Sequence, residues 1–120
     1  MSGKRKNQIN RPWMARQGDV LLTAVPSIPS TARAHARPLD RGRVVLAYGE
    51  VTGHAHALAE GTALAFGPSD DAFWLEVPEG QTAVVTHEEH AAIAIPADVR
   101  FIAVRRQVEY TPERLVNVAD

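Results

Sequence analysis

The sequence predicts a small antiparallel β-sandwich or β-barrel in a single domain, with one short helix near the end of the chain. The chain has 120 residues, of which 45% are hydrophobic and 22% are charged, and this suits one globular domain with a core. Short β-prone stretches recur along it, separated by turn signals rich in Gly, Pro and Asp. Turn signals about every 8–12 residues are typical of sandwiches and barrels.

The expected strands are short, and turn residues bound each of them. In chain order they cover residues 20–25, 43–48, 54–58, 62–66, 72–77, 82–86, 91–95 and 99–108. The last is the longest, and its alternation places Ile102 and Val104 on one face. Residues 31–42 show no period and are expected to form a long exposed loop. Thr111 suits an N-cap and Pro112 a first helical position, so the one expected helix covers residues 112–118.

The charge is distributed unevenly along the chain. Residues 1–16 contain five basic residues and no acidic one, whereas the remainder is net acidic. We expect a flexible basic arm over residues 1–16 and a single β domain over residues 17–120, since terminal residues are usually loose unless tied down. Such an arm suits a phosphate backbone or an acidic protein surface. Because the aromatic residues are not interleaved with the basic ones, nucleic-acid binding is the weaker alternative.

The chain contains no cysteine, which excludes disulfides, thiolate metal sites and thiol catalysis. A bound metal would therefore be held by imidazole and carboxylate, which suit Zn, Fe, Mn or Ni. No apolar run approaches the roughly 20 residues of a membrane span. The basic N-terminus lacks the apolar stretch of a secretory signal, so we expect a cytoplasmic protein without membrane contact.

Four of the five histidines occur in two close pairs. His54 and His56 are two residues apart on an expected strand, so their imidazoles point the same way, and Glu60 follows four residues later. His87 and His90 flank two glutamates, and both can face one ion only if the chain turns between them. Together these residues offer enough ligands for a three- or four-coordinate divalent metal with an open position.

The two acids of the second cluster, Glu88 and Glu89, are the predicted catalytic residues. A carboxylate beside a bound metal can act as a general acid or base while its neighbour serves as a ligand or orients one. The alternative interpretation is structural. In that case His54 and His56 form hydrogen bonds in a turn, and residues 87–90 form a solvated loop.

The order of these pieces resembles the cupin family, whose fold is a jelly roll. The first cupin motif has a glycine, an HxH pair and a glutamate, as in Gly49, residues 54–56 and Glu60, although Gly49 stands one residue too close. The second motif matches less well, because six residues separate the Pro-Glu-Gly turn at 78–80 from His87 and no Asn follows at the usual place. The resemblance implies these metal ligands: His54, His56, Glu60, and either His87 or His90.

A closer resemblance covers almost the whole chain. It is carried by the segments RQGDVLL (16–22), GEVTGHAH (49–56), HEEHA (87–91), IP (95–96) and EYTPE (109–113). These motifs are similar to those of a family of small uncharacterised bacterial and phage proteins. That resemblance implies that the chain has relatives, but it does not imply any particular activity.

Two functions are therefore expected from the sequence. The first is a metal-binding, cupin-like β protein, with or without enzymatic action on a small polar substrate. The alternative is a non-catalytic interaction or structural module of a bacterial or phage assembly. In either case we expect a homo-oligomer, because a small β domain gains core by pairing with a second copy, and a further protein partner is compatible with both.

Overall fold

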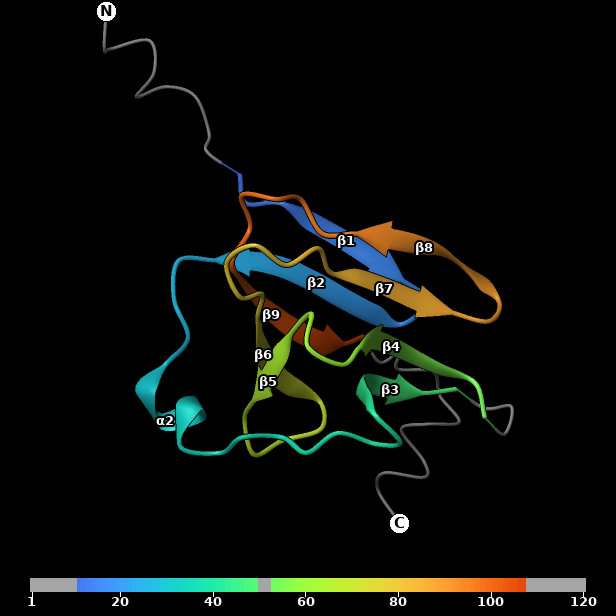
Figure 1. Cartoon of the computed structure of the whole chain (residues 1–120), viewed down its shortest axis with the longest axis horizontal. Helices are drawn as coiled ribbons and strands as arrows, with labels where there is room; N and C mark the ends of the chain where they lie inside the picture. The colour runs from blue at the N-terminus through green and yellow to red at the C-terminus, as the bar shows by residue number, and fades with distance from the viewer. Residues whose placement is uncertain (1–10, 50–52, 108–120) are drawn as a thin grey trace, which may run out of the picture.

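The computed structural model describes residues 11–49 and 53–107, and in this part of the chain nine strands form two antiparallel sheets packed together (Figure 1). One sheet has the order β1-β2-β9-β6-β5 and the other the order β3-β4-β7-β8. The strands are β1 (Met14–Gln17), β2 (Val20–Val25), β3 (Arg43–Tyr48), β4 (Ala55–Ala59), β5 (Leu64–Phe66), β6 (Ala72–Glu76), β7 (Val84–His87), β8 (His90–Ala94) and β9 (Phe101–Arg106). The predicted all-β sandwich is confirmed.

The hydrophobic core fills the space between the two sheets. The five-stranded sheet contributes Leu22, Phe73 and Ile102, and the four-stranded sheet contributes Leu58 and Val85, all with at most 1% of their surface exposed. Alternation along each strand sends every second side chain inward. Each large apolar side chain buried in this way contributes about 1.5–3 kcal/mol, so the core fixes the register on which the loops at the sandwich ends depend.

The first strand lies earlier in the chain than predicted. Residues Met14–Gln17 form β1, which pairs with β2 through the turn at Gly18 and Asp19. The backbone N–H of Ala24 also donates to the Trp13 carbonyl at 2.8 Å. The last residues of the expected arm, 14–16, are therefore strand residues that backbone pairing with β2 holds in place. Residues 1–10 lie outside the described residues.

The prediction of a long exposed loop over residues 31–42 is partly wrong. It includes most of the short helix α2 (Ser30–Arg33), which buries Ala32. Beyond the helix, the Arg37 N–H donates to the Ala65 carbonyl, and the Arg37 guanidinium stands 4.2 Å from the centroid of the Phe73 ring. These contacts with β5 and β6, which are distant in sequence, hold the segment against the edge of the sheet. The helix predicted over residues 112–118 lies outside the described residues.

Two turns and the paired ends of β3 and β4 lie at one end of the sandwich, on the right in Figure 1. The turns join β1 to β2 and β7 to β8. Their meeting follows from the antiparallel order of the sheets, because alternate turns of such sheets return to the same end. No described helix has the length and apolar character needed to cross a membrane.

Candidate functional site

Four histidines gather at this end of the sandwich. His87 ends β7 and His90 begins β8, and the two residues pair directly across a two-residue turn. The ring centroid of His87 lies 4.3 Å from that of His56, 4.7 Å from that of His90 and 6.0 Å from that of His54. The chain thus turns within the HEEH segment, as it must if both of its histidines are to face one point.

The histidines line a pocket of about 380 Å³. Its lining residues are Gly18, Asp19, Tyr48, Gly49, His54, His56, His87, Glu89, His90 and Arg106. A Cβ atom at Gly18 would lie 3.0 Å from Nε2 of His90 and 3.5 Å from Nε2 of His56. A Cβ at Gly49 would lie 3.3 Å from Nε2 of His87. The two glycines therefore leave open the space that these ring nitrogens face.

A buried amide fixes the orientation of His56. Gln17, which is 2% exposed, donates from Nε2 to the carbonyl oxygens of Val85 at 3.1 Å and Ala91 at 2.9 Å. Its Oε1 atom lies 2.8 Å from Nδ1 of His56. Since Oε1 can only accept, Nδ1 of His56 carries the hydrogen and donates it. A neutral His56 therefore keeps the lone pair of Nε2, on the pocket side of the ring.

The pKa of His56 agrees with a neutral ring. Burial, and then the repulsion that a charged His56 would meet from a charged His87, lowers this pKa to about 4. Across the pocket, Oδ1 of Asp19 lies 3.7 Å from Nε2 of His56, and Oδ2 of Asp19 accepts a hydrogen bond of 2.8 Å from Arg106. Partial burial acts to raise the pKa of Asp19, but the hydrogen bond and charge of Arg106 outweigh it and lower this pKa. The site thus sets an ionised carboxylate against an imidazole lone pair.

The other two inward-facing histidines differ in their hydrogen bonds. Nδ1 of His54 is buried without a hydrogen-bond partner among the described residues, with Oε2 of Glu89 at 3.6 Å. Nδ1 of His87 instead accepts the backbone N–H of Glu89 at 3.0 Å. The described side chains, as they stand, contain no group of three or more His, Asp or Glu residues arranged to hold a metal ion.

The predicted acidic residues have separate positions. Glu60 does not line the pocket; it lies beyond the other end of β4, about 13 Å along the strand from His56 at roughly 3.3 Å per residue, near Gly42. Glu88 is exposed, and its carboxylate accepts the Ala55 N–H at 3.0 Å, which lowers the pKa of Glu88. Glu89 lines the pocket. Of the predicted acids, only Glu89 lines the pocket, although the charge of Glu88 also interacts with His54 and His87.

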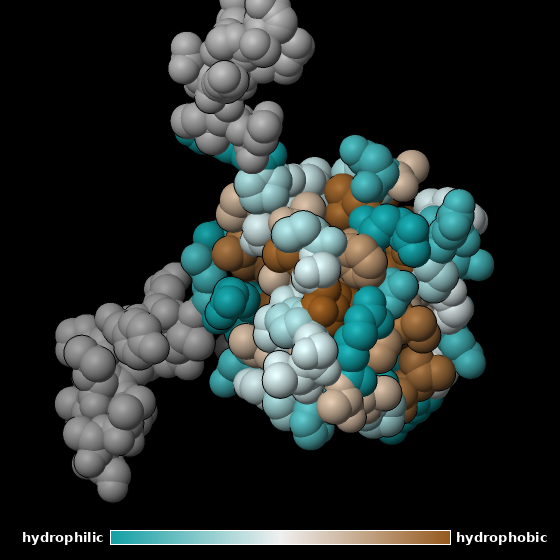
Figure 2. Space-filling view, turned by 90° about the vertical axis from the view of Figure 1, so that its left-hand side faces the viewer, coloured by the Kyte–Doolittle hydropathy of each residue, from teal (hydrophilic) through white to brown (hydrophobic). Residues whose placement is uncertain are grey.

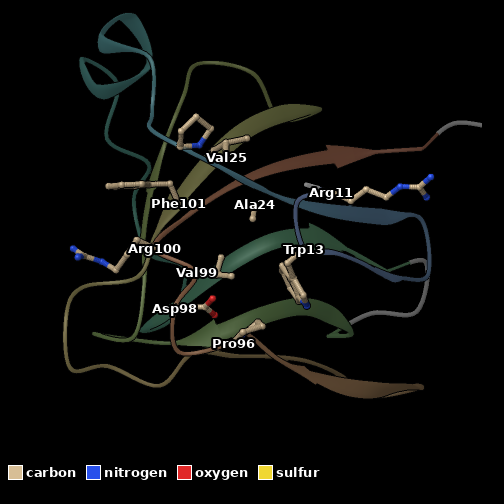
Figure 3. Close-up of a pocket in the computed structure, with 10 residues that line it drawn as sticks. Arg11, Trp13, Ala24, Val25, Pro96, Asp98, Val99, Arg100 and Phe101 are labelled. Atoms are coloured by element: carbon tan, nitrogen blue, oxygen red, sulfur yellow. The ribbon is translucent and has the colours of Figure 1, made fainter. Parts of the chain in front are cut away.

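A larger cavity, of about 650 Å³, lies at the opposite end of the sandwich (Figure 3). Trp13, Val99 and Pro96 line it, and the side chains of Arg11 and Arg100 extend away from it. The surface at this end mixes apolar and polar residues in small patches (Figure 2). No histidine lines this cavity, so the histidine pocket remains the candidate site.

Comparison with protein families identifies relatives of the chain. Residues 16–107 match the family described as Domain of unknown function (DUF8820). The chain belongs to this family. No curated protein and no solved structure shows a significant match. The predicted membership of an uncharacterised family is thus confirmed, and every residue that lines the histidine pocket lies inside the DUF8820 domain.

Sequence reasoning missed Asp19 and Arg106, which line the pocket, and Gln17, which orients His56 from behind it. Gln17 and Asp19 belong to a Gln-Gly-Asp sequence that signals only a turn, and Arg106 ends a long strand. They reach the histidines because the two sheets pack together, and no local pattern encodes that contact. One signal in the sequence could have pointed to Gln17. Its amide lies just before a β turn, and pairing with β2 directs its side chain into the sandwich.

Proposed function

We propose that the histidine pocket of this DUF8820 protein binds a divalent metal ion, with Nε2 of His56 as its central ligand. The observation that supports this most strongly is the hydrogen bond between His56 and Gln17. Histidine ligands of metals usually donate their other ring N–H to a carbonyl or carboxylate, which fixes the tautomer and aims the lone pair. The buried Gln17 amide provides such an acceptor.

The position of Asp19 supports the same proposal. Its carboxylate and the unprotonated Nε2 of His56 are both acceptors, and they face each other at 3.7 Å. Two acceptors at this distance repel each other unless positive charge lies between them. A divalent ion bound to both would remove the repulsion, and imidazole with carboxylate is a ligand set that Zn, Fe, Mn and Ni accept.

His90 and His54 would complete the proposed ligand set. His90 is exposed, and its Nε2 faces the space beside Gly18 that His56 also faces. The buried Nδ1 of His54 has no hydrogen-bond partner among the described residues, so a metal ion would satisfy it. Binding then requires side-chain rotations, which exposed residues complete within nanoseconds. Glu60 is left out of the proposal because it lies at the far end of β4.

Reactivity would depend on Glu89, the predicted catalytic acid that lines the pocket. Its side chain is 59% exposed and its carboxylate lies 3.6 Å from Nδ1 of His54, so it is within reach of both a ligand in the pocket and solvent. A metal-dependent reaction on a small polar substrate therefore remains our proposal for any catalysis. Glu88 is not part of it, because Glu88 does not line the pocket and one of its carboxylate oxygens accepts the Ala55 N–H.

The test measures the metal content of untagged protein prepared without nickel, stripped with EDTA and dialysed against cobalt or zinc. We expect stoichiometric binding by the wild type. His56→Ala should weaken binding at least about tenfold, as loss of a ligand or of its orienting partner typically does. His35→Ala is the matched control, because His35 is exposed and lies outside the pocket. Equal binding by all three proteins, or none by the wild type, would refute the proposal.

A second candidate function, self-association, has one observation in its favour. β8 is the last strand of its sheet; Gln17 of β1 already donates to the Ala91 carbonyl, but β8 also exposes Ala92 and Ala94 without a charged residue between them. Uncharged edge strands favour pairing with another strand. We propose that β8 pairs with β8 of a second copy. Light scattering should then give a dimer for the wild type and a monomer for Ala92→Lys; a monomeric wild type at micromolar concentration would exclude the pairing.

A further inference from the structure

His87 differs from His56 in which ring nitrogen carries the hydrogen. The backbone N–H of Glu89 donates to Nδ1 of His87 at 3.0 Å, so this nitrogen holds the lone pair. A neutral His87 then carries its hydrogen on Nε2. That nitrogen faces the space beside Gly49, which also lines the pocket. His87 therefore presents a hydrogen-bond donor to the pocket, whereas His56, in ring contact with it, presents a lone pair.

Arg106 supplies further donors on the same pocket wall as Asp19. One of its terminal nitrogens, Nη2, donates to Oδ2 of Asp19 at 2.8 Å. The hydrogen bond and charge of Asp19 raise the pKa of Arg106, so the guanidinium stays charged. A guanidinium has five N–H donors, and those not bound to Asp19 remain for a ligand. A guanidinium binds carboxylates and phosphates through paired N–H donors, and a carboxylate is the smaller of the two.

The size of the pocket limits what these donors can hold. A water molecule occupies about 30 Å³ in the liquid, so the pocket of about 380 Å³ has room for a molecule of a few heavy atoms together with a metal ion. With a divalent ion beside Asp19, the charges of the ion and Arg106 exceed those of the two pocket carboxylates. The interior would then attract an anion rather than a neutral molecule.

We infer that the pocket takes a small carboxylate, with one oxygen on the metal and the N–H groups of His87 and Arg106 on the carboxylate. This inference rests on the proposed metal site and names its ligand class. His87 is then a binding residue and not a metal ligand. The two neighbouring rings then have different roles. His87 binds the carboxylate through the hydrogen on its Nε2, and His56 binds the metal through the lone pair on its Nε2.

Acetate and acetamide are matched probes, because they have the same shape and differ in charge. Cobalt-loaded protein is titrated with each, and the visible spectrum of the cobalt reports entry into its coordination sphere. We expect a saturable change with acetate and a much weaker one with acetamide. His87→Leu should weaken acetate binding about tenfold, which corresponds to about 1.4 kcal/mol. His87→Gln, whose amide restores an N–H near the position of Nε2, should stay within about threefold of the wild type.

The cobalt content of each variant separates the possible failures. Full cobalt content with equal acetate affinity in His87→Leu and wild type would overturn the donor role of His87. Loss of cobalt from His87→Leu, at concentrations that load the wild type, would make His87 a metal ligand and overturn the inference. Equal affinity for acetate and acetamide would overturn the carboxylate class. A wild type that binds no cobalt would refute the metal site itself, and the inference with it.

Discussion

Replacement of Gln17 by leucine removes the amide that joins the two sheets beside the histidines. Leucine fills a similar volume but provides no donor or acceptor. The carbonyls of Val85 and Ala91 each lose a donor, and the Nδ1–H of His56 loses its acceptor. A buried polar group left without a partner costs about 1–3 kcal/mol. Three such losses therefore predict a destabilisation of at least about 3 kcal/mol.

Urea unfolding of the metal-free protein, followed by tryptophan fluorescence, measures this loss. With an m-value of about 1–3 kcal/mol/M, the midpoint of Gln17→Leu should fall by at least about 1 M. Gln81→Leu is the matched control, because Gln81 is exposed, and surface changes usually stay within about 0.5 kcal/mol. If Gln17→Leu loses no more stability than Gln81→Leu, the amide does not hold the sheets together, and the assignment of the His56 tautomer fails with it.

Three further predictions concern the pocket. Folding lowers the pKa of His56 from 6.5 to about 4, so metal-free protein should lose up to about 3 kcal/mol of stability as the pH falls from 6.5 to 4. In His56→Gln the urea midpoint should depend less on pH over this window, and the same pH dependence as in the wild type would contradict the shift. Gly18→Ala and Gly61→Ala should each cost about 1–2 kcal/mol because both glycines have positive φ, but only Gly18→Ala should weaken zinc affinity in calorimetry, since its Cβ enters the space beside the histidines. Asp19→Asn should weaken zinc binding while Glu60→Gln leaves it unchanged; the reverse order would restore Glu60 as a ligand.

The sequence predicted the sandwich, and it singled out the four histidines that the structure brings to one pocket. Strand alternation and turn residues act locally, so the stretches around Leu22, Leu75 and Ile102 could be recognised without knowledge of their partners. The HEEH segment was also informative, because two histidines three residues apart on β strands can face one pocket only if the chain turns between them. The structure places that turn at Glu88 and Glu89.

The remaining features of the site depend on contacts between distant segments. Gln17 and His56 are 39 residues apart in sequence and meet only because β1 lies against the second sheet. Glu60 follows the HxH pair at a suitable distance in sequence, yet an extended strand carries it away from the histidines. Spacing alone could not reveal this, since the same separation in a tight turn would bring Glu60 back. The start of β1 was missed for a similar reason, because its short sequence gains order from pairing with β2.

Nitrogen-15 spectra of the histidine rings, recorded during a zinc titration, test the central claim most directly. In the metal-free protein, Nδ1 of His56 should be protonated and Nε2 unprotonated. Equimolar zinc should shift the His56 Nε2 resonance to the range of metal-bound imidazole and leave Nδ1 protonated, while the resonances of His35 stay unchanged. A His56 ring that is protonated on Nε2 before zinc, or whose resonances equimolar zinc does not move, would contradict the account.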